Sequence, residues 1–219
     1  IPATHYLYYG TDVVRSALPQ NQVKVQDSSG QIIVDNGLIK IAINKEYYSV
    51  FNAVYYDTNG NKVFEESEKI VNPGNIFLVD AFDKSQYNSN LFKTVNVTVE
   101  EAGPLRAVVR FEGYLLDSSN RNLTQYIVRM YTYANNPLVR LKYTLVDTRE
   151  DNQPYNSSLP FSAVGYGLEL PTLVNGNYRF SGDGNIYSGA STGENYIFQD
   201  GQMRYYDGYL QWPAFAFNY

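Results

Sequence analysis

The chain of 219 residues contains no cysteine and only one histidine, His5. Without cysteine, neither a disulfide framework nor a thiolate metal site can form. A Ser-His-Asp triad would have to use His5, which stands among aromatic residues near the N-terminus, where a strand-face or interface role is the commoner one. We therefore expect no catalytic residues and no cofactor, so the sequence indicates a protein that is not an enzyme.

Long apolar runs and basic patches are also missing. No stretch reaches the length of a membrane-spanning helix, and no amphipathic helix of three turns is visible. There are 17 basic and 22 acidic residues, giving a formal net charge of −5, and the basic residues stand singly. The sequence therefore predicts no membrane span and no nucleic-acid partner.

The beginning of the chain, Ile1-Pro2-Ala3-Thr4, has no initiating Met and no signal-peptide pattern. It has the form of a mature end left by signal cleavage. On this basis we expect a secreted or cell-surface protein.

Tyrosine, in contrast to cysteine and histidine, is abundant in this chain. The chain has 22 Tyr and a single Trp, and 16% of its residues are aromatic. Tyr favours strands and carries a polar tip, so most of these side chains are expected on strand faces. The alternative is a large contact surface for partners or glycans, because rigid aromatic rings bind at a low entropic cost.

Alternation of apolar and polar residues is clearest from Val95 to Asp147. Four alternating runs are separated by short Gly, Pro or Asn breaks, which is typical of an antiparallel β-meander. Asn36-Gly37 and Asn59-Gly60 mark further turns. The sequence predicts an all-β fold, an antiparallel β-sandwich or barrel-like single domain over residues 1–219.

Charged residues within this pattern are expected to be structural. The arginines of the meander should form cross-strand pairs with Glu112 and Asp147, each contributing about 0.2–1 kcal/mol. Residues 65–69 form the one dense charge run and are expected to be a solvated turn.

The run Gly103-Pro-Leu-Arg-Ala-Val-Val-Arg-Phe-Glu-Gly113, followed by Tyr126–Ala134 and Pro137–Leu145, resembles the exo-rhamnogalacturonan lyase-like family. The resemblance implies that family's N-terminal β-domain, of the RIFT-barrel type. Enzymes of the family carry a helical toroid after the β-domain, and this chain is expected to end where that toroid would begin. Tyr143 stands where relatives often have His, so the resemblance assigns no catalytic residue here.

Three N-glycosylation sequons begin at Asn96, Asn122 and Asn156. Each lies on the predicted polar side of a strand, at a turn or in a loop, as a secreted glycoprotein requires. Two turns rich in oxygen atoms, residues 57–61 and 182–185, are candidates for structural calcium, although both read more simply as tight turns.

These observations favour a non-catalytic structural protein that assembles with copies of itself into a filament, tube or coat. A sheet edge in one subunit would be completed by a terminal strand of the next, either residues 1–9 or residues 212–219. The interface candidates are Ile1, Tyr6, Tyr8, Tyr9, Trp212, Phe215, Phe217 and Tyr219.

Two alternatives remain open. The first is a carbohydrate-binding module related to polysaccharide lyases, in which sugars stack on Tyr205, Tyr206, Tyr209 and Trp212. The second is polysaccharide lyase activity in the chain itself, which would need a general base and acid.

Overall fold

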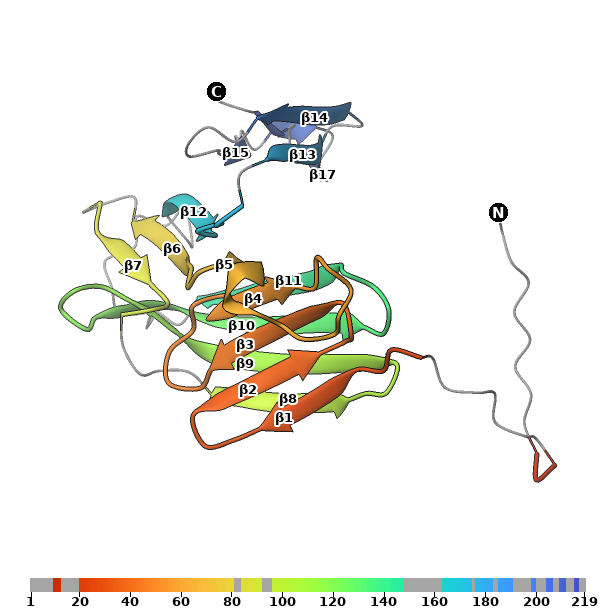
Figure 1. Ribbon diagram of the computed structural model, residues 1–219. Helices are drawn as coiled ribbons and strands as arrows, with labels where there is room; N and C mark the ends of the chain where they lie inside the picture. The colour runs from red at the N-terminus through yellow and green to blue at the C-terminus, as the bar shows by residue number, and fades with distance from the viewer. Residues whose placement is uncertain are drawn as a thin grey trace. The chain divides into compact units, whose positions relative to one another are not determined.

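The computed structural model describes residues 10–12, 20–80, 84–91, 96–147, 163–174, 176–182 and 185–190, together with four short strands nearer the C-terminus (Figure 1). The chain divides into two compact units, Ile1–Leu173 and Val174–Tyr219. Regular structure in the described residues consists of strands and one short 3₁₀ helix. The predicted all-β class is confirmed.

Five strands form the first sheet of the larger unit. They are β1 (Lys24–Asp27), β2 (Gln31–Asp35), β3 (Ile39–Asn44), β4 (Ala53–Tyr56) and β5 (Lys69–Val71). Neighbours along the chain pair antiparallel in the order β1-β2-β3-β4-β5. Ile32, Val34 and Ile41 are fully buried, so the apolar residues of β2 and β3 turn one face of this sheet inward.

The second sheet contains seven strands. They are β6 (Asn75–Asp80), β7 (Gln86–Asn88), β8 (Asn96–Ala102), β9 (Arg106–Leu116), β10 (Asn122–Tyr133), β11 (Val139–Asp147) and β12 (Ala163–Glu169). The order is β11-β10-β9-β7-β6-β12, and β8 pairs with β9 beside this path. Strands β11 and β12 are therefore the two ends of the sheet.

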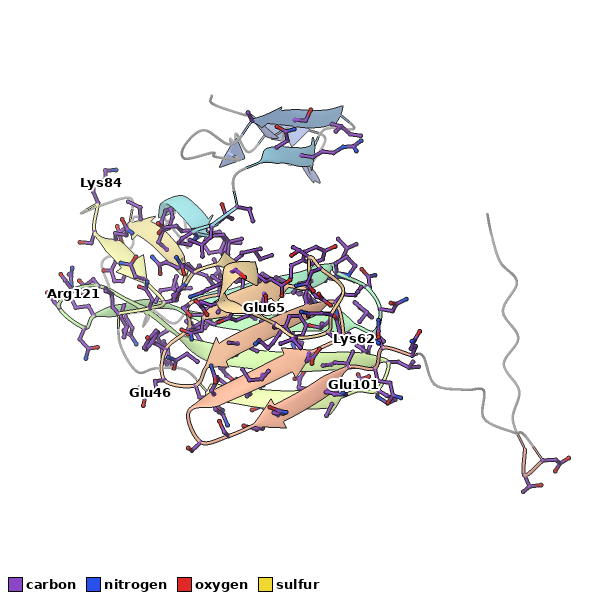
Figure 2. All side chains as sticks on the ribbon, in the orientation of Figure 1. Glu46, Lys62, Glu65, Lys84, Glu101 and Arg121 are labelled. Carbon is purple, nitrogen blue, oxygen red and sulfur yellow. The ribbon has the colours of Figure 1, made fainter. Side chains whose placement is uncertain are left out.

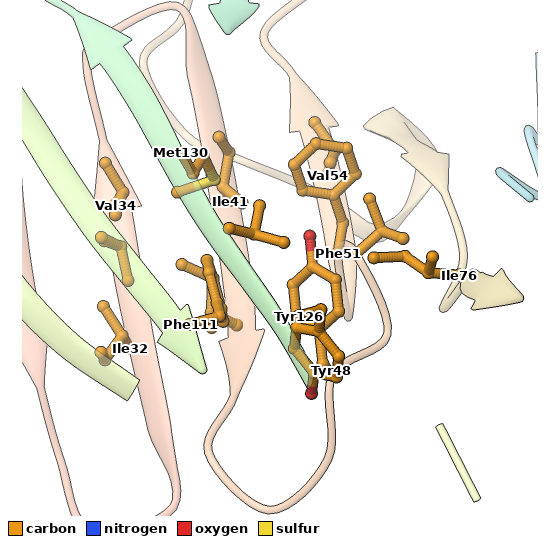
Figure 3. Close-up of a cluster of buried hydrophobic side chains, with 14 of the residues drawn as sticks. Ile32, Val34, Ile41, Tyr48, Phe51, Val54, Ile76, Phe111, Tyr126 and Met130 are labelled. Atoms are coloured by element: carbon orange, nitrogen blue, oxygen red, sulfur yellow. The ribbon is translucent and has the colours of Figure 1, made fainter. Parts of the chain in front are cut away.

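The core lies between the inner faces of the two sheets, as Figure 3 shows for its central part. Each fully buried large apolar side chain contributes about 1.5–3 kcal/mol relative to an exposed one. The residues labelled in that view are Ile32, Val34, Ile41, Tyr48, Phe51, Val54, Ile76, Phe111, Tyr126 and Met130. Charged side chains such as Glu46 and Arg121 lie around the outside of the unit (Figure 2).

The predicted meander is confirmed as β8, β9, β10 and β11, joined by antiparallel ladders. Val97 and Val99 pack against the core, as their alternation predicts. Arg110 pairs with Glu112 at 2.6 Å, but both residues lie on β9, so this is not the cross-strand pair that was expected. Arg129 of β10 pairs with Glu100 of β8 across β9, and Arg106 pairs with Glu101. These partners are set by the pairing of β8 and β10 with the two edges of β9.

The charge run at residues 65–69 is only in part the solvated turn that was expected. It forms the 3₁₀ helix η1 (Glu66–Glu68) and the start of β5, and Glu68 is only 4% exposed. One carboxylate oxygen of Glu68 accepts hydrogen bonds from the backbone N–H and the hydroxyl of Thr58, both at 2.9 Å. The run is therefore tied to the turn that follows β4.

The smaller unit is built from short antiparallel pairs. Strand β13 (Asn177–Gly182) pairs with β14 (Asn185–Ala190), and β15 (Phe198–Gln199) pairs with β18 (Phe215–Ala216). Strand β16 (Arg204–Tyr206) pairs with β17 (Tyr209–Gln211). The sequence predicted a single domain over residues 1–219. The division into two compact units does not test that prediction.

Candidate functional site

Four tyrosines from four elements of the larger unit meet at one place, which we call the tyrosine seam: Tyr48, Tyr126, Tyr143 and Tyr166. Tyr48 lies on the connection between β3 and β4, and the others lie on β10, β11 and β12. The Tyr48 and Tyr143 hydroxyls are 3.0 Å apart and share a hydrogen bond. The Tyr48 ring lies 5.3 Å from that of Tyr126, and the Tyr143 ring 6.5 Å from that of Tyr166.

Strand register and loop contacts hold these side chains in place. On β10, residues at alternate positions from Thr124 to Thr132 are buried, so Tyr126 points into the core. The backbone carbonyl of Tyr48 accepts a hydrogen bond from the Ser89 hydroxyl at 2.8 Å, which fixes the β3–β4 connection. Figure 3 shows the Tyr48 and Tyr126 side chains adjacent within the core.

The seam runs from the interior to the surface. Tyr126 and Tyr48 are 0% and 1% exposed, Tyr143 is half-buried and Tyr166 is 42% exposed. The Tyr126 hydroxyl is buried and has no hydrogen-bond partner among the described residues. A buried hydroxyl without a partner is unfavourable, and the Thr124 and Thr132 hydroxyls on the same strand are in the same situation.

Burial governs the acidity of these phenols. Desolvation raises the pKa of Tyr143 to about 12, although its hydrogen bond with Tyr48 acts in the opposite direction. Desolvation, together with the neighbouring tyrosines, also raises the pKa of Tyr48, and the same two causes act on Tyr126 and on the partly covered Tyr166. At neutral pH the four hydroxyls therefore stay protonated and serve as hydrogen-bond donors and acceptors, and not as bases.

The second notable feature is the open edge of β11. This strand pairs with β10 over nine consecutive residue pairs, from Thr132↔Val139 to Thr124↔Asp147, without a register shift. Its other edge has no partner strand within the part of the chain that the structure describes. Val139, Leu141, Tyr143 and Leu145 are only partly buried and pack against the core from this edge.

The remaining edges of the larger unit are shorter or interrupted. Strand β8 has a register shift between Val99 and Glu101, and β12 has one between Ala163 and Gly165. Strand β5 is three residues long, and its Val71 forms an isolated bridge with Thr172. Bulges, short lengths and charges are the usual protection of a sheet edge against further pairing, so β11 is the most regular open edge described.

Some of the residues singled out from the sequence lie in described parts of the chain. Asn96 begins β8 and Asn122 begins β10, and both are exposed, as the sequons require. Tyr205 and Tyr206 belong to β16, and the register places Tyr206 opposite Tyr209 of β17. Phe215 belongs to β18 and pairs with Gln199. None of these residues is a member of the tyrosine seam, which the sequence analysis did not predict. Outside the described residues lie Ile1, His5, Tyr6, Tyr8, Tyr9, Asn156, Trp212, Phe217 and Tyr219.

The turn at residues 57–61 uses its oxygens internally. The Asp57 carboxylate accepts hydrogen bonds from the backbone N–H groups of Gly60 and Lys62, at 2.7 and 3.0 Å. Asn59 and Asn61 accept from backbone N–H groups two residues further on. Within the described ranges, no group of three His, Cys, Asp or Glu side chains could hold a metal ion. The second candidate turn includes residues 183–184, which lie outside these ranges.

Residues 189–193 read Gly-Ala-Ser-Thr-Gly, which matches the nucleophile-elbow pattern G-x-S-x-G. That motif needs a strand followed by a tight turn into a helix. Gly189 and Ala190 instead end β14, which pairs antiparallel with β13, while residues 191–193 lie outside the described residues. The motif therefore has no supporting context in the described part of this unit.

The larger unit is an all-β sandwich, and β11 provides the longest open sheet edge among its described residues. Residues 23–192 match the family model of the central β-sandwich domain of PcRGLX-like proteins. The chain therefore belongs to this family, and the resemblance seen in the sequence is confirmed. The matching family model is that of a central domain, whereas the resemblance implied the N-terminal β-domain of the lyase-like family.

No curated protein matches the chain. None of the described helices is long and apolar enough to span a membrane.

Proposed function

We propose that this protein is a non-catalytic structural subunit that assembles with copies of itself by strand addition at the edge of β11. The observation that carries the proposal is the nine-pair ladder between β10 and β11. The other edge of β11 has no partner strand among the described residues. An open, regular edge offers backbone N–H and C=O groups to a strand of another subunit.

The side chains of β11 support this proposal. Leu141, Tyr143 and Leu145 pack against the core but are only half-buried. A strand added beside β11 would place its own inward side chains next to them and remove apolar surface from water. Arg140 and Lys142 are exposed on the opposite face. The Arg140 guanidinium lies 5.9 Å from the centroid of the Tyr131 ring, so it is directed along the sheet toward β10.

Two apolar segments are candidate donors, residues 1–9 and residues 212–219. The second contains β18, whose Phe215 and Ala216 pair with β15 of the same chain. Donation of this segment would require those pairs to open. We propose residues 1–9 as the donor. We further propose that the protein is a secreted glycoprotein at the cell surface, modified at Asn96, Asn122 and Asn156.

A complementation experiment tests the assembly. A variant lacking residues 1–9 should stay monomeric by light scattering and electron microscopy, whereas the full chain should form polymers. A synthetic peptide of residues 1–9 should bind the shortened variant and slow hydrogen exchange of the β11 amides. The matched control is the same peptide with Tyr6→Pro, which removes a backbone donor and should not bind.

Some outcomes would reject the proposal. A full chain that is strictly monomeric at high concentration would do so, as would a shortened variant that polymerises as well as the full chain. Protection of β11 by the peptide of residues 212–219 instead would reassign the donor while keeping the edge.

The chemistry of the tyrosine seam supports a non-catalytic role. Elimination by a polysaccharide lyase needs a base whose pKa lies near neutrality. The pKa values of Tyr48, Tyr126, Tyr143 and Tyr166 are all raised, and burial is the largest cause for each of them. Formation of unsaturated uronides from a polygalacturonan-type glycan would contradict this part of the proposal.

A carbohydrate-binding module is the second candidate. Membership of the PcRGLX-like family and the pairing of Tyr206 with Tyr209 in the β16–β17 hairpin favour it. Calorimetry with polygalacturonan-type oligosaccharides would test it. Binding by a monomer that is lost in Tyr206→Ala but retained in Tyr56→Ala would favour this function over assembly.

A further inference from the structure

The contact between Tyr143 and Tyr166 joins the two ends of the second sheet. Their ring centroids lie 6.5 Å apart with an interplanar angle of 69°, an edge-to-face arrangement. Tyr143 belongs to β11 and Tyr166 to β12, and no backbone ladder between these strands is present in the described residues. At this position β11 and β12 are therefore connected by a contact between side chains.

We propose that Tyr143 and Tyr166 are a site of oxidative cross-linking, at which a peroxidase using hydrogen peroxide joins the two rings within one chain. Each phenol gives one electron to the oxidant and its hydroxyl proton to water. The two phenoxyl radicals then form a carbon–carbon bond between positions ortho to their hydroxyls. The hydrogens on those carbons move to the oxygens and restore both phenols. Two electrons and two protons leave in all, and they reduce one peroxide to two waters.

Exposure selects this pair within the seam. Tyr166 is 42% exposed, so an oxidant can reach it and water can take its proton, whereas Tyr48 and Tyr126 are 1% and 0% exposed. Tyr143 is the ring in direct contact with Tyr166, and its hydroxyl is held by Tyr48 at 3.0 Å. A Tyr166 radical therefore has the Tyr143 ring beside it in the same chain. A tyrosine of another copy would first have to reach it by diffusion, so coupling within one chain is favoured.

The backbone around Tyr166 combines two glycines with a register shift, and the Phe77 ring packs closely against one of them, Gly167. Tyr166 stands between Gly165 and Gly167 on β12. A register shift in the ladder with β6 lies between Ala163 and Gly165. Glycine has no β-carbon and allows a wide range of backbone conformations. A covalent link between positions 143 and 166 would fasten β11 to β12 and restrict the unfolded chain.

The test uses the full chain and a photogenerated one-electron oxidant, since a small oxidant reaches partly covered rings. Equal amounts of unlabelled and heavy-nitrogen-labelled protein are mixed before oxidation. Mass spectrometry should find a dityrosine-linked peptide pair containing residues 143 and 166, in all-light and all-heavy forms only. Dityrosine fluorescence in the monomer fraction should be lost in Tyr143→Phe and in Tyr166→Phe, and the cross-linked protein should melt at a higher temperature.

The matched control is Tyr56→Phe, because Tyr56 is 40% exposed and has no ring contact in the described residues. Its fluorescence yield should equal that of the unmodified chain. Mixed light–heavy peptides would show coupling between copies and overturn the proposal. Unchanged monomer fluorescence in Tyr166→Phe, with circular dichroism confirming a folded variant, would overturn it as well. Neither outcome depends on whether the protein polymerises.

Discussion

The side-chain amide of Asn36 donates a hydrogen bond of 2.7 Å to the backbone carbonyl of Asn136, one hundred residues further along the chain. The same amide donates to the carbonyl of Tyr133 at 3.0 Å. The side-chain oxygen of Asn36 accepts from the backbone N–H groups of Leu38 and Ile39. Asn36 is fully buried, so this one side chain fastens the β2–β3 turn of the first sheet to the β10–β11 turn of the second.

Replacement of Asn36 by Ala should lower the free energy of unfolding by roughly 2–4 kcal/mol, because buried backbone groups lose their partners. Asn36→Asp should also destabilise, since a carboxylate keeps the acceptor but cannot donate to Tyr133 and Asn136. Urea titration would measure both changes. Asn61→Ala, at an exposed Asn with one similar turn hydrogen bond, is the control and should cost less than about 1 kcal/mol. Equal losses at the two positions would contradict the role assigned to Asn36.

Gly103→Ala should destabilise the protein by about 2 kcal/mol or more. Gly103 has a φ of +80°, a conformation that L side chains rarely adopt, and an added β-carbon would meet the backbone carbonyl of Val23. Backbone cannot swing aside as a flexible side chain can. Gly30→Ala is the matched control, because a β-carbon there meets nothing within 4 Å. Thermal melts of the two variants should therefore differ clearly, and similar melting temperatures would be incompatible with the close approach at Gly103.

Removal of the Tyr126 hydroxyl should leave stability within about 1 kcal/mol of the unmodified chain, or increase it. The hydroxyl is buried without a partner among the described residues, so Tyr126→Phe removes an unfavourable group while keeping the ring. Tyr48→Phe should instead cost about 0.5–1.5 kcal/mol, since it breaks the hydrogen bond with Tyr143. A larger loss for Tyr126→Phe than for Tyr48→Phe in urea titrations would mean that the Tyr126 hydroxyl has a partner.

Stability should decrease in acid partly through Glu68. Burial acts to raise the pKa of this carboxyl, but hydrogen bonds from Thr58, Glu65 and Asn59 outweigh it, and the pKa lies below the ordinary 4.5. The unfolded chain then binds the proton more tightly than the folded one, so the contribution of Glu68 is present above pH 4.5 and is lost as the pH falls through the folded-state pKa.

The measurement is the difference in unfolding free energy between the unmodified chain and Glu68→Gln across this range. The variant should be less stable at neutral pH, and the gap should narrow as the pH falls from about 6 to about 3. Glu169→Gln, at an exposed position, should show no gap at either end. A gap for Glu68→Gln that stays constant with pH would show that the carboxylate charge contributes nothing.

Much of the larger unit could be predicted from local patterns. The alternation from Val95 to Asp147 predicted four antiparallel strands, and Asn36-Gly37 predicted a turn in which Gly37 has a φ of +83°. These signals are local, because side-chain alternation and turn chemistry act over a few residues. Pairing partners were harder. The arginines were expected opposite Glu112 and Asp147, yet Arg129 pairs with Glu100, which no spacing along the chain indicates.

The tyrosine seam was not predicted. Its members stand at positions 48, 126, 143 and 166, and each one alone reads as an ordinary strand or loop tyrosine. A signal exists only in hindsight, in the glycines on both sides of Tyr166. The burial of Glu68 was also missed, because five neighbouring residues with four charged side chains predict a solvated turn unless a distant backbone group, here that of Thr58, needs an acceptor.

The sequence by itself determined the all-β class, the family and the faces of the meander strands, since hydrophobic burial with a period of two is written residue by residue. The tertiary structure alone decided which strands end the sheet, that β11 has no second partner strand among the described residues, and that Tyr143 meets Tyr166. Those outcomes depend on how the two sheets pack and on which strands lie at the ends of the second sheet. Both are determined by contacts between residues far apart in the chain.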